Sequence, residues 1–260
     1  MSDEDPRSLE SIGKAIKAKF EATGFPTEEQ VALTLAEDKW SVTRNARYRN
    51  KNDRRYHEID IIATKRPNPS TKTRVMLVVE CKKQEGYPWV FVAGSTKVRN
   101  HFSITIAAKE QSFDVLYAGV EREFTQHYYY DSKASTIHIS PNYIWGNKKE
   151  KDIDPIREAI YQTLNHWFEV WELEMLVAKE ATPILTYIYP VIVLNGRLVT
   201  YSVDGKVDEA DRVPYLIEYL PPEPLPVSGI VHSRKPVIID IVTLSHLREY
   251  LRLVQTRGIL

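Results

Sequence analysis

A chain of 260 residues is long enough to bury a substantial core, in one large domain or two small ones. With 43% hydrophobic and 27% charged residues the composition is that of an ordinary globular protein, and no apolar run is long enough for a membrane helix. Basic and acidic residues number 35 each, so the chain as a whole lacks the basic bias that is typical of nucleic-acid-binding proteins. The single cysteine, Cys81, excludes an internal disulfide and a cysteine zinc cluster. The single cysteine and an acidic start without signal-peptide features lead us to expect a cytoplasmic protein.

The N-terminal part is expected to hold two helices and a strand. Apolar residues at helical spacing predict the first helix over residues 8–22. A second helix is expected to follow, with Thr27 as its N-cap and with Glu28 and Glu29 in its first turn. Weak alternation then favours a strand over residues 40–48.

Two stretches have a clear strand character. Residues 56–64 read Y-H-E-I-D-I-I-A-T, and residues 74–82 read R-V-M-L-V-V-E-C-K. Both are rich in Val and Ile, as expected for the middle of a sheet that is covered on both faces. The polar segment 66–72 between them carries two prolines and predicts a hairpin loop.

Alternation along these two strands predicts which side chains share a face, because residues two apart in a strand point the same way. In the first strand one face is expected to hold Glu58, Asp60 and Ile62, and the opposite face His57, Ile59 and Ile61. In the second strand one face is expected to hold Met76, Val78, Glu80 and Lys82, and the opposite face Leu77, Val79 and Cys81. If the strands pair through the hairpin, Asp60, Glu80 and Lys82 converge at one point.

The remainder of the chain is expected to supply further helices and strands. The pattern over residues 89–149 is weak. The expected elements are a helix over 98–109, strands over 113–120 and 135–139, a long helix over 153–179, strands over 184–194, 213–220 and 236–242, and a closing amphipathic helix over 244–254. The aromatic step around Trp89 favours core packing over base contact.

The three converging residues predict a particular chemistry. Charged groups at the ends of apolar strands are costly unless they pair or bind a metal. Two carboxylates, from Asp60 and Glu80, and the main-chain carbonyl of Cys81 form an oxygen-rich set of ligands that suits Mg²⁺. Lys82 can orient or deprotonate a water and offset the charge of a phosphate. A metal, a water and a positive charge are what phosphodiester hydrolysis requires.

The motif E-I-D-I-I-A at residues 58–63, followed after a hairpin by V-V-E-C-K-K at residues 78–83, resembles the PD-(D/E)xK nuclease superfamily. That superfamily includes restriction endonucleases, Holliday-junction resolvases and Mrr-type restriction enzymes. The resemblance covers residues 26–84 well and the rest of the chain loosely. Ile59 stands where the family pattern has a proline.

The resemblance implies an α/β fold with a restriction-endonuclease-like core, in which helices flank a central mixed sheet. We expect a single domain over residues 1–260. Its core motifs would lie in 26–84, an insertion in 91–150, and the remaining core helices and strands in 152–256.

The resemblance also implies the activity: a Mg²⁺-dependent endonuclease that cuts DNA, with Mn²⁺ able to substitute, in restriction, phage defence or repair. Asp60 and Glu80 would bind the metal together with Cys81, and Lys82 would act in catalysis.

An acid from the preceding helix would add to this site. Glu28 is preferred because it shares a stripe with Val31 and Leu35, while Glu29 and Glu10 are alternatives. Either first-turn acid could equally serve only the helix dipole.

Candidate DNA contacts lie in the basic run before the first motif strand and just after the second. They are Arg44, Arg47, Arg49, Lys51, Arg54, Arg55, Lys83 and Gln84. A solvated hairpin is the alternative explanation of the basic run. The expected partner is double-stranded DNA, with a second copy or a partner subunit left open, since no segment identifies an interface, and no membrane is expected.

Two rival functions fit some of these residues. The first is a catalytically inactive module of the same fold that binds nucleic acid or a protein partner. The second is a magnesium hydrolase acting on small molecules, which explains the acids but not the basic run.

Overall fold

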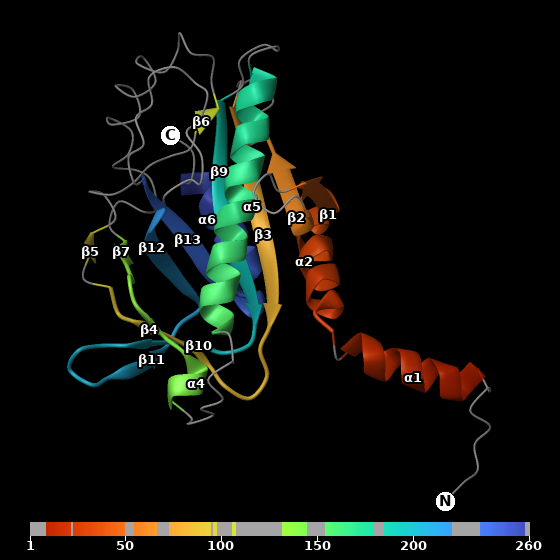
Figure 1. The fold of residues 1–260 in the computed structure, drawn as a ribbon, viewed down its shortest axis with the longest axis horizontal. Helices are drawn as coiled ribbons and strands as arrows, with labels where there is room; N and C mark the ends of the chain where they lie inside the picture. The colour runs from red at the N-terminus through yellow and green to blue at the C-terminus, as the bar shows by residue number, and fades with distance from the viewer. Residues whose placement is uncertain are drawn as a thin grey trace, which may run out of the picture.

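The computed structural model describes residues 9–21, 23–49, 55–66, 73–94, 96–97, 106–107, 132–144, 154–178, 185–219 and 235–257. Over these ranges the protein is an α/β structure in which helices lie on both faces of a mixed sheet (Figure 1). Among the helices that the structure describes, none combines the length and the hydropathy that crossing a bilayer requires.

The main sheet contains both motif strands at adjacent positions. In spatial order its strands are β1 (Ser41–Arg49), β2 (Tyr56–Lys65), β3 (Thr73–Lys83), β9 (Leu185–Asn195), β13 (Lys235–Thr243) and β12 (Arg212–Tyr219), and β6 (Ile106–Ala107) pairs with the start of β9. The pairs β1–β2, β2–β3 and β12–β13 are antiparallel, whereas β9 runs parallel to both β3 and β13. The strands expected from the Val- and Ile-rich runs are therefore confirmed within one or two residues.

A smaller sheet packs beside the main one. It has the order β11 (Val207–Glu209), β10 (Leu198–Tyr201), β4 (Trp89–Val92) and β8 (His138–Ile139), and β5 (Thr96–Lys97) pairs separately with β7 (Lys133–Ala134). Gly94 fits here because a Cβ at this position would lie 2.0 Å from the carbonyl oxygen of Ala134. The aromatic step at Trp89 is buried core, as expected.

The weak middle segment was predicted poorly. The expected helix over 98–109 is wrong at Ile106–Ala107, which form β6. The strand expected over 135–139 is shorter, because Ser135 makes only an isolated bridge to Tyr215 before β8 begins. The rest of 98–109 and the strand expected over 113–120 lie outside the described residues.

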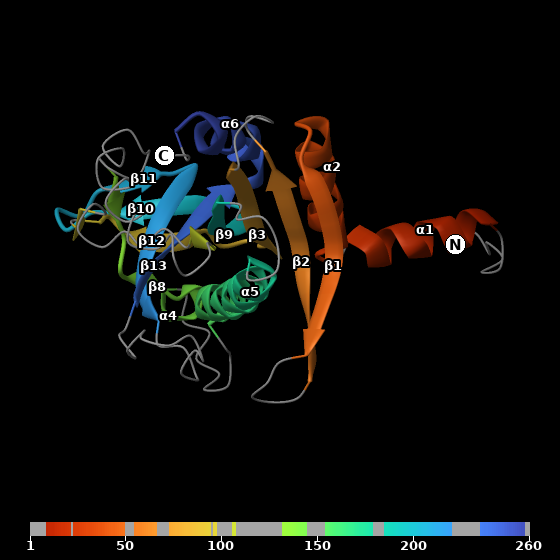
Figure 2. The ribbon, with the colours of Figure 1, turned by 90° about the horizontal axis from the view of Figure 1, so that it is seen from above.

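Helices cover the two faces of the main sheet unequally. They are α1 (Leu9–Glu21), α2 (Phe25–Glu37), α4 (Pro141–Ile144), α5 (Pro155–Ala178) and α6 (Leu247–Arg257), which follows the 3₁₀ turn η4 (Leu244–His246). Figure 2 shows α5 along one face of the sheet and α2 with α6 along the other. In the same view α1 extends away from the sheet beyond β1.

Each face has its own hydrophobic core. Leu35 of α2 and Tyr250 of α6 pack against Leu77 on one side, and Leu164 of α5 packs in a second cluster with Trp89 on the other. Burying one such side chain contributes about 1.5–3 kcal/mol. The two-sided burial explains why β3 and β9 are apolar at nearly every position.

The start of α2 differs from the expectation. Gly24, not Thr27, occupies the N-cap position, and it makes no side-chain capping bond. Thr27 lies inside the helix and is fully buried, and its hydroxyl oxygen accepts a hydrogen bond from the Asn195 amide at 3.1 Å. This bond fixes the first turn of α2 to the end of β9.

Strict alternation in β2 is also wrong at one point. Ile61 belongs to the core under α2, but Ile59, two residues earlier, belongs to the core under α5. The β1–β2 ladder skips the position where Asn45 is opposite Asp60, and Asn45 has a left-handed φ of 54°. The register is the same on both sides of this position, so the faces switch without an inserted residue.

Candidate active site

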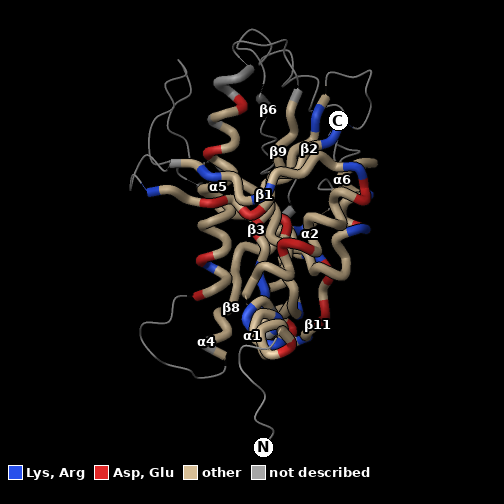
Figure 3. Tube along the Cα trace, turned by 90° about the vertical axis from the view of Figure 1, so that its right-hand side faces the viewer, with Lys and Arg blue, Asp and Glu red and all other residues tan. Residues whose placement is uncertain are grey.

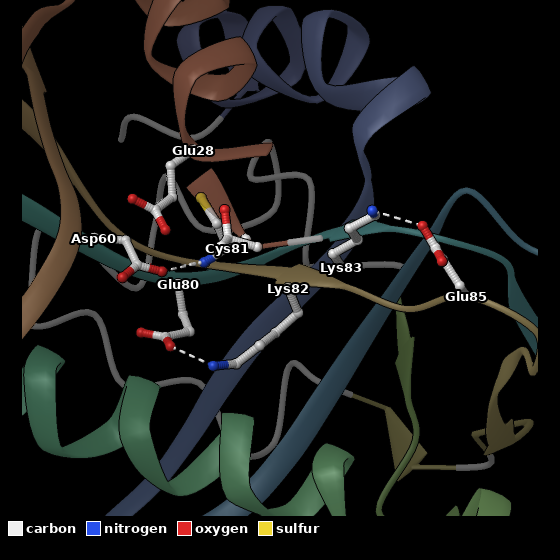
Figure 4. A pocket seen from close by; sticks show the side chains of 9 residues that line it. Glu28, Asp60, Glu80, Cys81, Lys82, Lys83 and Glu85 are labelled. Atoms are coloured by element: carbon white, nitrogen blue, oxygen red, sulfur yellow. Dashed lines mark hydrogen bonds and ion pairs between the residues drawn. The ribbon is translucent and has the colours of Figure 1, made fainter. Parts of the chain in front are cut away.

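The predicted catalytic and metal-binding residues line one pocket of about 520 Å³ between α2, β2 and β3 (Figure 4). Its lining consists of Thr23, Gly24, Glu28, Asp60, Glu80, Cys81, Lys82, Lys83 and Glu85. In Figure 4 Glu28 reaches down from α2, Glu80 and Lys82 extend toward α5, and Asp60 lies between them at the level of β3. The expected convergence of Asp60, Glu80 and Lys82 is therefore present in the structure.

Asp60 lies where β2 and β3 separate. The ladder between these strands ends at the pair Ile61–Val79, one residue before Asp60 and Glu80 would be opposite each other. The Asp60 carboxylate instead accepts a hydrogen bond of 2.7 Å from the main-chain N–H of Cys81. Burial, and after it the charge of Glu80, raises the pKa of Asp60 to about 7.

Glu80 is held from two sides on the face that α5 covers, and only 4% of it is exposed. Lys82 Nζ donates a hydrogen bond of 2.6 Å to its Oε1. His166 Nδ1 lies 3.2 Å from its Oε2, but without the alignment of a hydrogen bond. Burial would raise the pKa of Glu80, yet the contacts with His166 and Lys82 outweigh it and lower that pKa below its usual range.

Sequence reasoning missed the two residues that α5 contributes. Gln162 Oε1 accepts a second hydrogen bond from Lys82 Nζ, at 2.8 Å, and His166 lies one helical turn further along the same face. His166 is 4% exposed, with the ring of Tyr48 edge-on to it at 5.8 Å. Two polar residues four apart on a buried helical stripe were the available signal.

The three candidate helix acids, Glu28, Glu29 and Glu10, lie at different places in the structure. Glu28 lines the pocket, and burial raises its pKa even though Arg44 opposes the shift. Glu29 is 2.5 Å from Arg44, and Glu10 lies exposed on α1, 3.1 Å from Lys14. Of the three candidates only Glu28 is placed to act at this site.

The pocket offers hard oxygen donors. Asp60 and Glu80 supply carboxylates, and Cys81 supplies main-chain atoms, since its side chain packs in the core under α2. No group of three or more His, Cys, Asp and Glu side chains within the described ranges is arranged to hold a metal ion. Mg²⁺ does not need such a group, because it commonly binds one or two carboxylates and keeps several waters. The donor set therefore fits magnesium.

The basic run is partly neutralised in the structure. Arg44 pairs with Glu29, and the Nε of Arg47 is 3.1 Å from Glu58. Arg55 is exposed, whereas Lys51, Arg54 and the side chain of Arg49 lie outside the described residues. Figure 3 shows basic and acidic positions interspersed along the chain rather than separated into patches.

The two candidate contacts after β3 have different positions. Lys83 lines the pocket, with its Nζ 2.6 Å from the exposed Glu85 carboxylate. Gln84 is not among the residues that line the pocket. Its main-chain N–H donates to the carbonyl of Asn195 at 3.0 Å, and its side-chain amide donates to the carbonyl of Glu85 at 3.1 Å.

Comparison of this chain with protein-family models, curated proteins and solved structures found no match. Inference about function therefore depends on the pocket itself.

Proposed function

We propose that the protein is a Mg²⁺-dependent nuclease that hydrolyses DNA phosphodiester bonds on a restriction-endonuclease-like core. The observation that carries the proposal is the pocket in which Glu28, Asp60, Glu80 and Lys82 meet. A mixed sheet with helices on both faces is the coarse architecture that such a core requires. Double-stranded DNA is the proposed substrate, Mn²⁺ the substitute ion, and restriction, phage defence or repair in the cytoplasm the proposed setting.

Asp60, Glu80 and the Cys81 carbonyl would hold the magnesium ion, with Glu28 close by or acting through water. When bound, the ion would lower the pKa of a water and offset negative charge on the phosphate. Glu80 is already anionic at neutral pH because His166 and Lys82 lower its pKa. Asp60, with its pKa raised to about 7, must lose a proton first, so metal binding tightens as the pH rises toward 7.

Lys82 supplies the positive charge. Its ammonium group is held between Glu80 and Gln162, at 2.6 and 2.8 Å, and therefore has a defined position on the pocket wall. From there it can orient a water toward the phosphate and stabilise the charge that develops during attack. His166 contacts Glu80 and Gln162 contacts Lys82, so we assign both as positioning residues.

The test compares purified wild-type protein with Asp60→Ala and Lys82→Ala on plasmid, single-stranded and branched DNA, with Mg²⁺ or with chelator. Both variants should keep the fold and lose at least about 100-fold in cleavage rate. Asp208→Ala is the control, because Asp208 is an exposed acid on β11 that pairs with Lys206. An Asp60→Ala protein that cuts DNA at the wild-type rate would show that the site is wrong.

A second candidate function is a catalytically inactive module that binds DNA. It is favoured by the state of Lys82, whose ammonium group already donates to two protein partners. Calorimetry separates the two. A nuclease should bind Mg²⁺ in a way that Asp60→Ala abolishes, and an inactive module should bind DNA without any carboxylate-dependent magnesium signal.

A further inference from the structure

Helix α1 carries an apolar stripe that the rest of the described protein covers only in part, with the ring of Phe20 edge-on to Phe25 of α2 at 5.1 Å. Leu9, Ile12, Ile16 and Phe20 recur at intervals of three and four residues, so they share one face of the helix. Their exposed fractions are 87%, 41%, 62% and 40%. Figures 1 and 2 both show α1 projecting from the body of the molecule, next to the N-terminal end of α2. A contiguous apolar face of this kind marks an interaction surface.

The stripe is complementary to itself when two copies of α1 lie antiparallel. If the pairing centres between Lys14 and Ala15, Leu9 of one copy is opposite Phe20 of the other, and Gly13 is opposite Ile16. Gly13 has no atom of the described protein within 4 Å of where a Cβ would be, so the partner's isoleucine has room at the centre of the contact. The largest side chains would then meet at the ends, and the closest approach of the helices falls at Gly13.

The charges beside the stripe favour the same arrangement. Glu10 and Lys17 are seven residues apart, nearly two full turns, so they lie on the same flank of the stripe. In an antiparallel two-fold pair the same flanks of the two helices adjoin. With the pairing centred between Lys14 and Ala15, Lys17 of one copy then lies two residues, or about 3 Å, along the axis from the level of Glu10 of the other. A parallel pair would bring opposite flanks together and leave Glu10 about nine residues, or roughly 13 Å, from Lys19 of its partner.

We propose that the protein forms a two-fold dimer through antiparallel pairing of α1 with α1 of a second copy. Two-fold dimers are the commonest oligomers, and their contacts are self-complementary as this one is. A helix of 13 residues is about 20 Å long, so the contact is smaller than the usual ~800 Å² per partner. The dimer should therefore form in the micromolar range of concentration.

The dimer has a consequence for the pocket, and this consequence rests on the proposed nuclease function. Thr23 and Gly24, directly after α1, line the pocket. Antiparallel pairing places these residues of the two copies at opposite ends of the helix pair, so the assembly presents two sites. Two such sites could cut both strands of one duplex.

The test is sedimentation over 1–200 µM without metal in the Asp60→Ala background, so that its outcome is independent of cleavage. Wild-type α1 should give a monomer–dimer equilibrium, and Ile16→Glu should raise the dimer Kd at least 100-fold. Asp208→Glu on β11 serves as the matched folded control. Glu10→Lys and Lys17→Glu should each weaken the dimer three- to tenfold, and the double variant should restore it.

Four outcomes would overturn the proposal. The first is a monomer at 200 µM, and the second is a dimer that survives Ile16→Glu, which would place the contact elsewhere. The third is binding to vesicles containing 30% anionic lipid with no dimer in solution, since the lysines of α1 would then identify a membrane surface as its partner. Failure of the double variant to restore the dimer would reject the antiparallel arrangement.

Discussion

At the scale of single residues, Asp60 and Glu80 show how one pocket gives two acids different properties. Both are largely buried, yet contacts with His166 and Lys82 lower the pKa of Glu80, while burial and the Glu80 charge raise that of Asp60. Neighbouring acids with divergent pKa values are typical of functional sites. The two carboxylates repel each other when both are ionised, and a bound cation would offset this repulsion.

The raised pKa of Asp60 predicts a pH-dependent cost in metal-free buffer. Between about pH 4 and pH 7 the folded carboxyl keeps a proton that the unfolded chain has lost, so stability falls as the pH rises through this window and stays low above it. Asp60→Asn removes the cost and can still accept the Cys81 hydrogen bond. It should stabilise the protein at pH 8 by on the order of 2 kcal/mol and have little effect at pH 4.

Urea unfolding at both pH values, with chelator present, measures this difference. Adding Mg²⁺ should then stabilise the wild type and not Asp60→Asn, because the ion binds the folded state alone. If Asp60→Asn were less stable than the wild type at pH 8 without metal, Asp60 and Glu80 would not repel each other as the structure implies.

Gln162 offers a second prediction at this scale. Gln162→Ala removes one of the two acceptors that hold Lys82, while leaving Glu80 in contact with it. Because Gln162 is partly exposed, the variant should lose less than about 1 kcal/mol of stability. It should lower kcat about 10- to 100-fold with little change in KM, as expected of a residue that positions a catalytic group.

Gln162→Glu is the informative control for this prediction. It keeps an oxygen acceptor for Lys82 and should restore the position of the ammonium group while raising the pH at which activity appears. A purely structural role for Gln162 would make both variants track protein stability and would leave the pH profile unchanged.

At the scale of elements, the switch of faces in β1 and β2 depends on Asn45. Its φ of 54° is in the left-handed region, which asparagine and glycine adopt at low cost. Asn45 also donates a hydrogen bond of 2.8 Å to Glu58. The distortion allows Ile59 to enter one core and Ile61 the other, and it leaves Asp60 at the level of the sheet.

Asn45→Val should therefore destabilise the protein by about 1–3 kcal/mol, since a β-branched residue at positive φ is strained. Asn45→Gly loses the same bond to Glu58 without the strain and should cost less than about 1 kcal/mol. Denaturant unfolding of the two variants measures the difference. Equal losses would mean that the side-chain bond matters and the backbone conformation does not.

Local sequence patterns predicted some elements of the fold correctly and others not. The central strands and the long helix α5 were predicted within one or two residues, because Val- and Ile-rich runs and helical spacing are local patterns. Face assignments on β3 were right, but those on β2 were wrong at Ile59, because a single left-handed residue on the neighbouring strand decides them. The cap of α2 was missed because Thr27 is used in a contact with Asn195, far along the chain.

In the candidate site, too, the residues that are close along the chain were predicted and the distant ones were not. Asp60, Glu80 and Lys82 lie on two consecutive paired strands, so alternation and one hairpin were enough to bring them together. His166 and Gln162 reach them from a helix about 80 residues later, across a part of the chain where the patterns are weak. Long-range contacts of this kind depend on topology, which periodicity does not encode.

At the scale of the whole molecule, zero net charge limits how the protein can bind DNA. Each phosphate contact by Lys or Arg contributes about −0.9 to the slope of log K against log salt. Arg44 and Arg47 are already paired with acids, so fewer cations are available than the sequence suggests. Binding should therefore be weak at physiological salt and should depend on releasing these arginines.

Glu58→Gln tests this idea, because it removes the acid that pairs with Arg47. In the Asp60→Ala background it should increase DNA affinity several-fold and steepen the salt slope by about 0.9, as expected for one new phosphate contact. Glu37→Gln changes the charge equally and releases Arg248, but it lies about 13 Å along α2 from Glu28. Equal effects of both variants in a salt titration would show that only net charge matters. A steeper slope for Glu58→Gln alone would place the duplex along β1, beside the pocket.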